Sequence, residues 1–446
     1  MDIFRGKKIT VMGLGLLGRG VGDAKFLAEN GAELIVTDLK SEAELAPSLE
    51  ALKGFPNITY VLGGHRLSDF RDRDFILKAA GIPLDSPFIA EARRRGIPVE
   101  MSVSLFARLT EATLIGVTGT RGKSTTTHLI YEILAAAHRG TDTRVFLGGN
   151  VRGVATLPLL PETKAGDFAV LELDSWQLQG FGEAGISPHI AVFTTLFADH
   201  QNYYKGSMDT YLEDKANVFN HQGAEDVLIL GRQVEPVIRQ RYNGIRSRVV
   251  AAPALPTSWK LCIPGEHNRE NAALAREAAR QCGVEESIIQ SVLQTFPGVP
   301  GRLEHVADIG GVSFYNDTTA TTPDAALAGL RALGSEKNII LIMGGADKSL
   351  DMSGFLLELP AFCKAVFVLP GTGTSRVRPQ LQKLAESGTP VFFVSSMSDA
   401  VSEARAHAAY SDVILLSPAF ASFGLFQNEF QRGDEFINAV HALAQQ

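Results

Sequence analysis

The sequence predicts an α/β fold of parallel sheets, because short β-branched runs alternate with amphipathic stretches along most of the chain. At 446 residues the chain is too long for a single core and is expected to form about two to four domains. Near 100–113 a helical stretch leads into a new strand and a glycine-rich turn, and near 297–301 the pentapeptide PGVPG can continue neither neighbour. We therefore expect three domains, at 1–110, 111–298 and 299–446.

The predicted strands are short apolar runs rich in valine and isoleucine. They lie at 8–12, 33–37, 114–118, 168–173, 190–194, 227–230, 338–343, 365–368, 390–394 and 412–416. Helical patterns separate most of them, as at 123–138 and 268–282. Strands that are joined through helices are typical of βαβ units, which build parallel sheets.

The composition excludes several classes of protein. A net charge of -7 leaves no basic excess to neutralise phosphates, so we expect no nucleic-acid partner. Cys262, Cys282 and Cys363 lie far apart, which excludes a disulfide framework and a thiolate zinc site and suits a reducing compartment. The chain shows no signal peptide and no apolar run of about 20 residues. We therefore expect a cytoplasmic protein without a membrane span, and a monomer.

The strongest local signal is the segment 116–125, which reads G-x-x-G-x-x-G-K-S-T between an apolar run and a helical pattern. Glycines let backbone N–H groups turn toward phosphate oxygens, while Lys123 can reach the outer phosphates and Ser124 can hold Mg²⁺. The standard P-loop has glycine where Val117 stands, and a glycine-rich turn without a nucleotide is the alternative. The context predicts a nucleoside triphosphate site formed by Gly119, Thr120, Gly122, Lys123, Ser124 and Thr125.

A second glycine-rich turn follows the first predicted strand. Gly13-x-Gly15-x-x-Gly18 opens a helical pattern, and Asp38 follows at the end of the next strand, which is the dinucleotide fingerprint. Any nucleoside diphosphate fits such a turn as well as NAD does, and a turn without a ligand remains open. We favour a substrate linked to a nucleoside diphosphate, bound by Gly13, Gly15, Leu16, Leu17, Gly18 and Asp38.

Acidic residues and a histidine are predicted at the carboxyl edge of the central sheet. Glu172 ends a buried apolar strand, where a carboxylate is costly unless it meets a cation such as Mg²⁺. The next strand, IAVFTTLFADH, is expected to end in Asp199 and His200 at the same edge. A helix cap or a salt bridge is the alternative for Glu172. Lys215 lies on a segment that is expected to be helical, where most lysines are simply solvated.

The segment PGEHNRENAALA at 264–275 is expected to start a helix. Asn268 and Asn271 are three residues apart, which places them on one helix face. Their amides suit the edge of an adenine or a ribose. Capping of the helix by Asn268 is the alternative.

Together these motifs resemble those of the Mur ligases. The order GVTGTRGKSTT, LELDSWQL, a strand ending in DH, GEHNRENAALA, PGRLE, YNDTTAT, GGADKSLD and LSPAFASFGLFQNEFQRGDEF is the order found in that family. The resemblance covers nearly the whole chain and is most like the branch that adds glutamate to UDP-N-acetylmuramoyl-L-alanine. It implies a Rossmann-like N-terminal domain for the UDP end, a central P-loop domain with a parallel mononucleotide-binding sheet for ATP, and a Rossmann-like C-terminal domain for the amino acid.

The resemblance also implies roles for single residues. The catalytic residues would be Lys123, Glu172, His200 and Lys215. The ligands of two Mg²⁺ ions would be Ser124 or Thr125, Glu172, His200 and Lys215, the lysine after carbamylation by CO₂. The residues that hold the adenosine and phosphates of ATP would include Asn268, Asn271, Arg302 and Asp317. Asn150 would line the phosphate region on the UDP-substrate side. The incoming glutamate would contact Thr321, Lys348, Ser422 and Phe423.

The function implied is the ATP-dependent addition of D-glutamate to UDP-N-acetylmuramoyl-L-alanine through an acyl phosphate, in the synthesis of peptidoglycan precursors. The sequence departs from the glutamate-adding branch at several positions: Thr319 stands for lysine, Gly301 for histidine and Asp174 for a small polar residue, residues 78–83 lack Ser-Pro, and Phe430 comes one place late.

Four alternatives remain open at this point. The amino acid could be L-glutamate or another residue. The chain could instead be an NAD-dependent oxidoreductase that uses the first glycine-rich turn. It could also be a binding or regulatory ATPase without ligation. Folylpolyglutamate-type ligases share the central domain, but they do not need the UDP-binding residues 1–110.

Overall fold

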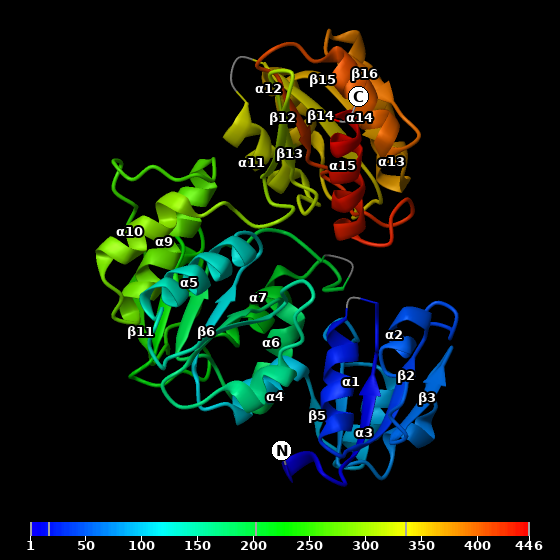
Figure 1. Cartoon of the computed structure of the whole chain (residues 1–446), viewed down its shortest axis with the longest axis vertical. Coiled ribbons are helices and arrows are strands. Elements are labelled where there is room, and N and C mark those ends of the chain that lie inside the picture. Colours follow the sequence, from blue (N-terminus) through cyan, green and yellow to red (C-terminus); the bar gives the residue numbers. More distant parts are fainter. Residues whose placement is uncertain (1, 17, 201–202, 335–336, 445–446) are drawn as a thin grey trace. The chain divides into compact units, whose positions relative to one another are not determined.

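The computed structural model describes residues 2–16, 18–200, 203–334 and 337–444 (Figure 1). Their strands form three sheets with helices between successive strands, which confirms the predicted α/β fold. The chain forms two compact units: the first holds Met1–Leu196, Asp209–Pro253 and Leu274–Ile289, and the second holds Phe197–Met208, Ala254–Ala273 and Gln290–Gln446. The domain boundaries at 110 and 299 stay predictions.

The first sheet is parallel and has the strand order β3-β2-β1-β4-β5. Its elements are η1 (Asp2–Phe4), β1 (Lys8–Met12), α1 (Arg19–Glu29), β2 (Glu33–Asp38), α2 (Ala46–Glu50), β3 (Ile58–Leu62), η2 (Leu67–Phe70), β4 (Phe75–Lys78), α3 (Pro87–Arg94) and β5 (Val99–Glu100). Because β1 lies between β2 and β4, the loop after β1 opens at a switch point in the strand order. Such points are where open α/β sheets bind ligands.

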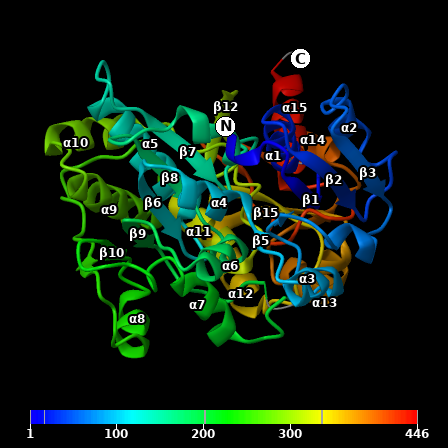
Figure 2. The same ribbon diagram turned by 90° about the horizontal axis from the view of Figure 1, so that it is seen from below.

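The central sheet is also parallel, with the order β11-β10-β9-β6-β8-β7 (Figure 2). Its elements are α4 (Ser102–Leu109), β6 (Thr113–Thr118), α5 (Lys123–Ala137), β7 (Val145–Gly149), η3 (Leu157–Glu162), β8 (Phe168–Glu172), α6 (Ser175–Ala184), β9 (Ile190–Phe193), α7 (Met208–Ala216), β10 (Val227–Leu230), α8 (Glu235–Arg241), β11 (Arg248–Ala251), α9 (Glu266–Gln281) and α10 (Glu286–Thr295). Strand β6 lies between β8 and β9, so the glycine-rich loop after β6 also opens at a switch point.

The third sheet has the order β12-β13-β17-β14-β15-β16. Its elements are β12 (Glu304–Ile309), β13 (Val312–Asn316), α11 (Pro323–Leu333), β14 (Ile339–Gly344), α12 (Ser353–Phe362), β15 (Cys363–Leu369), α13 (Thr372–Glu386), β16 (Val391–Phe393), α14 (Met397–His407), β17 (Val413–Leu416) and α15 (Glu429–Leu443). The expectation of parallel pairing fails at one place, because β12 runs antiparallel to β13. Gly310 and Gly311 join them with φ of 58° and 77°, the left-handed conformation that a two-residue hairpin needs.

Apolar side chains cover both faces of the sheets. In the first unit one hydrophobic cluster runs from α1 and β1 through Leu105 and Phe106 of α4 to β8 and β9. In the second unit two clusters lie on β14, one built around Leu341 and the other around Ile342 and Phe436. Within the residues that the structure describes, no helix combines the length and the apolar character needed to cross a bilayer.

The core of the third sheet allows a direct test of the fold. Leu341 is fully buried in β14, so Leu341→Ala should leave a cavity and lower the free energy of unfolding by about 2 to 5 kcal/mol. Leu357→Ala is the matched control, because Leu357 on α12 is 82% exposed and should tolerate the change. Hydrogen exchange in β13, β14 and β17 measures the loss. Equal protection in the two variants would contradict the placement of β14 at the centre of the sheet.

Candidate active site

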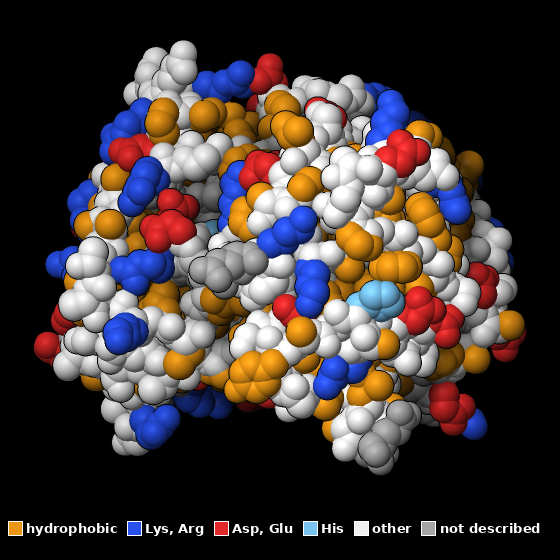
Figure 3. All heavy atoms as spheres, turned by 90° about the horizontal axis from the view of Figure 1, so that it is seen from above, with side chains coloured by type: hydrophobic (Ala, Val, Ile, Leu, Met, Phe, Trp, Pro, Cys, Tyr) orange, Lys and Arg blue, Asp and Glu red, His pale blue; other side chains and the backbone are white. Residues whose placement is uncertain are grey.

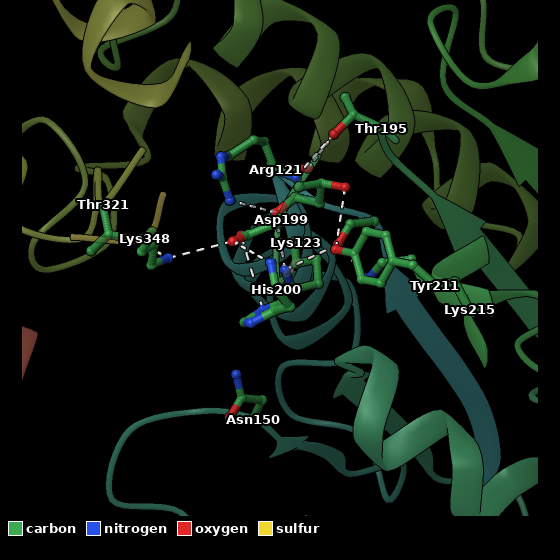
Figure 4. Close-up of polar contacts among 12 residues, drawn as sticks. Arg121, Lys123, Asn150, Thr195, Asp199, His200, Tyr211, Lys215, Thr321 and Lys348 are labelled. Atoms are coloured by element: carbon green, nitrogen blue, oxygen red, sulfur yellow. Dashed lines mark hydrogen bonds and ion pairs between the residues drawn. The ribbon is translucent and has the colours of Figure 1, made fainter. Parts of the chain in front are cut away.

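The loop between β6 and α5 is held against the segment that follows β9. The Thr120 N–H donates to the Thr195 carbonyl over 2.7 Å, and the Arg121 N–H donates to the Thr195 hydroxyl over 2.9 Å (Figure 4). Gly119 has φ of 141°, and a Cβ there would lie 2.0 Å from Thr194 Oγ1. No other residue fits this loop at position 119 without a shift of the backbone.

The groups of the loop that stay available for a phosphate are those at the start of α5. The N–H groups of Thr120, which sequence analysis assigned to the phosphate site, and of its neighbour Arg121 donate to Thr195 instead. Gly122 is left-handed and caps α5, and the first N–H groups of any α-helix have no partner within the helix. Ser124 and Thr125 are buried in that first turn. A helix start with these N–H groups and its positive dipole end suits a phosphate.

Two lysines place their ammonium groups on one carbonyl of this loop. Lys123 Nζ donates to the Gly119 carbonyl over 3.0 Å and to the Thr120 carbonyl over 3.2 Å. Lys215 Nζ donates to the same Gly119 carbonyl over 2.8 Å. Lys215 is only 1% exposed, so it is no solvated surface lysine.

Tyr211 is a member of this cluster that sequence analysis missed. It lies one helical turn before Lys215 on α7, and Lys215 Nζ lies 4.8 Å from the centre of its ring (Figure 4). The Tyr211 hydroxyl is 3.3 Å from the Thr120 hydroxyl. In the sequence, only the four-residue spacing could have linked Tyr211 to Lys215, because it places both on one face of a helix. That spacing does not indicate which other side chains this face contacts.

Glu172 ends β8 as predicted and is 3% exposed. It does not cap α6, because Asp174 is the N-cap residue. Among the described residues no basic group lies within ion-pair distance of the Glu172 carboxylate, which accepts one long hydrogen bond, from the Asn150 amide over 3.5 Å. Asn150 also donates its N–H to the Glu172 carbonyl over 2.8 Å and accepts a hydrogen bond from Arg19. A buried carboxylate with so little compensation fits a divalent cation.

The prediction that Asp199 and His200 end a strand is wrong. Strand β9 ends at Phe193, because Thr194 turns its hydroxyl onto the Thr118 carbonyl and the chain leaves the sheet. Asp199 and His200 lie in the loop beyond it, in the second unit. Asp199 is buried, and its carboxylate accepts hydrogen bonds from the His200 N–H over 2.9 Å and from Lys348 Nζ over 3.4 Å.

The described residues contain no group of three or more His, Cys, Asp or Glu side chains placed to hold a metal ion. This is compatible with Mg²⁺, which is usually bound by one or two carboxylates together with phosphates and water rather than by a complete protein cage. Glu172 fits the role of such a single carboxylate.

In the second unit Asn268 and Asn271 lie on one face of α9, as predicted. The Asn271 amide donates to the Asn268 side-chain oxygen over 3.2 Å. Asn268 does not cap the helix, since α9 begins at Glu266 and the Asn268 amide donates to the Pro264 carbonyl. The capping alternative is therefore excluded for Asn268.

Asp317 lies inside the second unit. Its carboxylate accepts hydrogen bonds from the Leu303 N–H over 3.2 Å and the Ser417 hydroxyl over 2.9 Å. Burial raises the pKa of Asp317 to about 7 despite these bonds and the nearby Arg302. Asp317 thus anchors the chain that carries Arg302.

The candidate amino-acid residues lie on loops after three neighbouring strands, β13, β14 and β17. Lys348 Nζ donates to the Thr321 hydroxyl over 3.1 Å (Figure 4). A short antiparallel bridge between Ala346 and Ala421 joins the loop of Lys348 to the loop of Ser422. Ser422 is buried, whereas Phe423 is 64% exposed.

At the first sheet, the glycine-rich turn closes on Asp38. The Gly15 N–H donates to the Asp38 carboxylate over 3.1 Å, and Gly18 is the left-handed residue that precedes α1. Leu16 is 44% exposed beside this contact. Leu17 lies outside the described residues.

Lys78 is a further residue that sequence analysis missed. It is 2% exposed at the end of β4, and its Nζ donates to the carbonyls of Ala79, Ala80 and Ile82. Burial lowers the pKa of the Lys78 ammonium group to about 8. The loop 79–82 packs on Gly13, so Lys78 holds the wall of the first glycine-rich turn.

On the face drawn in Figure 3, basic and acidic side chains alternate among the described residues. The blue and red groups do not merge into one basic area on that face. This face therefore offers no continuous basic area of the kind that a nucleic acid would need.

Comparison with known families gives three matches along the chain. The Mur ligase MurD-like N-terminal domain matches residues 7–100, the Mur ligase middle domain matches 117–252, and the glutamate ligase domain of Mur ligases matches 301–420. The matched stretches include the glycine-rich turn at 13–18, the loop residues 119–125, and Thr321 and Lys348, whereas Ser422 and Phe423 lie beyond the third match.

Curated relatives and solved structures agree with these matches. Proteins named UDP-N-acetylmuramoylalanine--D-glutamate ligase are 38% identical in Roseiflexus sp., over 98% of this chain and 99% of the relative, and 35% identical in Geobacillus kaustophilus, over 97% of both. The fold is similar to that of UDP-N-acetylmuramate-alanine ligase from Thermotoga maritima, with a TM-score of 0.63 and 20% identity over 98% of this chain and 100% of that one. The fold is also similar to that of MurF ligase from the same organism, solved in complex with ADP. The TM-score is 0.58 and the sequence identity is 17%, over 98% of this chain and 96% of that one.

The close contact at Gly119 predicts a loss of nucleotide binding. Gly119→Ala should displace the loop and weaken the affinity for a nucleoside triphosphate by about a hundredfold or more, because small displacements of binding groups have effects of this size. Gly244→Ala is the control, since a Cβ at Gly244 meets no atom within 4 Å. Equilibrium binding of a fluorescent ATP analogue measures both. Unchanged affinity in Gly119→Ala would mean that the loop does not bind the nucleotide.

Proposed function

The chain belongs to the Mur ligase family, and from this membership we propose that it is an ATP-dependent ligase that joins D-glutamate to UDP-N-acetylmuramoyl-L-alanine. Relatives with that name are 32–38% identical over 97–99% of this chain. One structural observation carries the proposal: two ammonium groups converge on the Gly119 carbonyl of a phosphate loop. Cations concentrated there fit the triphosphate that such a ligase consumes.

Mg²⁺ would neutralise the negative charge that gathers on phosphate oxygens during the transfer. Ser124, Glu172 and His200 are the residues that the family roles assign to it. The buried Glu172 carboxylate supports this role, because the described residues offer it no basic partner. The involvement of two ions, rather than one, is part of the proposal.

The reaction begins with the carboxylate of the UDP-linked substrate, which is a poor electrophile. One of its oxygens attacks the γ-phosphorus of ATP, the bond to ADP breaks, and an acyl phosphate forms. The glutamate amine then attacks the acyl carbon, and the tetrahedral intermediate expels phosphate as the amide forms. Lys123 stabilises the charge on the phosphate oxygens, and no protein nucleophile is needed.

The remaining binding roles follow from the placement of the loops. The turn at Gly13, Gly15, Leu16 and Gly18, with Asp38, would hold the UDP end, and Asn150 would hold the substrate near the phosphates. Asn268, Asn271, Arg302 and Asp317 would hold ATP. Thr321, Lys348 and Ser422 would hold glutamate, since the Lys348 ammonium and the Thr321 hydroxyl at 3.1 Å together suit a carboxylate. Phe423 would contact the amino acid from its exposed position.

We further propose that Lys215 is carbamylated. The Nζ ammonium group loses one proton, the neutral amine forms a bond to the carbon of CO₂, and a second proton leaves Nζ. The cation thus becomes a carbamate anion that can hold a second Mg²⁺. Burial beside the phosphate loop supports this role, because a fully buried lysine has no access to the bulk water that stabilises an ammonium group.

We also propose a cytoplasmic monomer with domains at 1–110, 111–298 and 299–446. The three dispersed cysteines suit a reducing compartment.

The identity of the amino acid is tested by phosphate release. With ATP, Mg²⁺ and UDP-N-acetylmuramoyl-L-alanine, release should depend on D-glutamate and stay near background with L-glutamate, D-glutamine and other D- and L-amino acids. Steady release without any amino acid would favour an ATPase that does not ligate. Phosphate release with L-glutamate but not with D-glutamate would show that the substrate is the L-stereoisomer. NADH binding, measured by fluorescence, tests the oxidoreductase alternative, which leaves the phosphate loop without a role.

The carbamate has its own test. Lys215→Ala should lose about a hundredfold or more in kcat, because it removes the ligand that orients charge at the phosphates, and small carboxylates such as formate or acetate should restore part of the activity. Lys53→Ala, at a lysine whose side chain is 75% exposed, is the control and should behave like the wild type with or without the added acid. Full activity of Lys215→Ala without any additive would remove the carbamate from the mechanism.

A further inference from the structure

Arg432 of α15 is the largest side chain that is fully buried in the described part of the chain. Its guanidinium group makes three hydrogen bonds. Nε donates to the Thr318 hydroxyl over 3.1 Å, Nη2 to the Thr318 carbonyl over 2.7 Å, and Nη1 to the Phe420 carbonyl over 3.1 Å. Burying a charged group is costly unless its donors are satisfied, and here neutral oxygens satisfy them.

The charge of Arg432 is not cancelled by an ion pair. Among the described residues the structure gives it no carboxylate partner at ion-pair distance, and Glu429, three residues earlier, is the only acid that raises its pKa. Burial lowers the pKa of Arg432 to about 10, which still leaves it protonated near neutral pH. Arg432 is therefore a buried positive charge in the second unit that no carboxylate of the described residues pairs with.

This charge lies where the three candidate amino-acid loops meet. Thr318 precedes Thr321 on the loop after β13, and Phe420 precedes Ser422 on the loop after β17. The third loop, after β14, also touches the guanidinium, because a Cβ on Gly345 would lie 3.4 Å from Arg432 Nη1. Gly345 is three residues before Lys348.

The contacts also fix α15 to the same loops. The Thr318 hydroxyl donates to the Glu429 carbonyl over 2.8 Å. Gly433 packs so closely on Thr318 that a Cβ at 433 would lie 2.8 Å from Thr318 Cγ2. Arg432 thus joins one helix to three loops, and it does so with a charged group where an uncharged amide could have supplied hydrogen bonds.

We propose that Arg432 is a positioning and specificity residue, which fixes the three amino-acid loops and whose charge makes the pocket select an amino acid with an anionic side chain. The proposal rests on the proposed function, and it names the chemical class of the amino acid. Glutamate carries two carboxylates, and Lys348 alone is one cation. A second positive charge in a low-dielectric interior favours the dianion over its neutral isostere, glutamine.

The test compares D-glutamate with D-glutamine in full-length variants. Arg432→Gln, which removes the charge, should raise the KM for D-glutamate about tenfold or more and reduce the preference for D-glutamate over D-glutamine, as the ratio of kcat/KM values, by about tenfold or more. The KM for ATP should stay within about twofold. Arg432→Lys, which keeps the charge but not the planar fork, should raise the KM and keep the preference within about threefold. An unchanged preference in Arg432→Gln would overturn the proposal.

A second variant keeps the test decisive if Arg432→Gln does not fold. Glu429 is partly exposed on the first turn of α15, and Glu429→Gln removes the acid that opposes the charge of Arg432. The preference for D-glutamate should then rise about twofold or more, a gain that structural damage cannot produce. An unchanged or lower preference would contradict the proposed role of the charge.

Lys364→Met is the matched control for the loss of one cation in the same sheet. Lys364 pairs with Asp412 at the amino end of β15, whereas the three loops leave the carboxyl ends of their strands. This variant should keep both KM and preference, and a loss of preference in it equal to that of Arg432→Gln would overturn the proposal. A wild-type enzyme that prefers a neutral amino acid would instead overturn the proposed function itself.

Discussion

The structure depends on the close contact between Gly119 and the segment after β9. There the loop has no room for a side chain, and Thr195 takes up two of its N–H groups. The Gly119 carbonyl is thereby turned toward Lys123 and Lys215, which donate to it over 3.0 and 2.8 Å. Two ammonium groups on one carbonyl concentrate positive charge at the loop, which suits a polyanion.

In each of the three sheets, a buried cation donates hydrogen bonds to the carbonyl groups of a loop at the sheet edge. Lys78 donates to three carbonyls of the loop 79–82 in the first sheet, Lys215 donates to the phosphate loop of the central sheet, and Arg432 donates to two loops of the third. Each cation is buried, and each holds a loop that follows a parallel strand. A net charge of -7 gives no hint of these three buried cations. All three loops face anionic ligands in the proposed reaction: a pyrophosphate, a triphosphate and a dicarboxylic amino acid.

Sequence reasoning succeeded where a signal is local. The strands β9, β10 and β14 are buried along their whole length, so they appear in the sequence as continuous apolar runs. The G-x-x-G-x-x-G-K-S-T loop could be predicted because its glycines and its lysine determine the local backbone turn. Among the described residues it missed seven strands: β3, β4, β5, β7, β11, β12 and β13. Of these, β5 has only two residues, and the residues of β11 are half-exposed or exposed. It misplaced Asp199 because the apolar pattern continues past Phe193 although the backbone leaves the sheet. The burial of Lys78, Lys215 and Arg432 could not be predicted, because their partners are set by tertiary contacts and a lysine or arginine is exposed by default.

The two departures from the family pattern near the amino-acid loops are in contact with each other. Thr319 donates both its N–H, over 3.2 Å, and its hydroxyl, over 2.9 Å, to the carbonyl of Gly301. At position 319 a short hydroxyl side chain stands where the family has a long cation, and at position 301 a glycine stands where the family has an imidazole. The two positions are joined by these hydrogen bonds. Such a compensated exchange alters packing at the base of the loop and leaves Thr321, Lys348 and Arg432 in place. The loss of the lysine removes one positive charge, so the selection of an acidic amino acid falls more heavily on the two cations that remain.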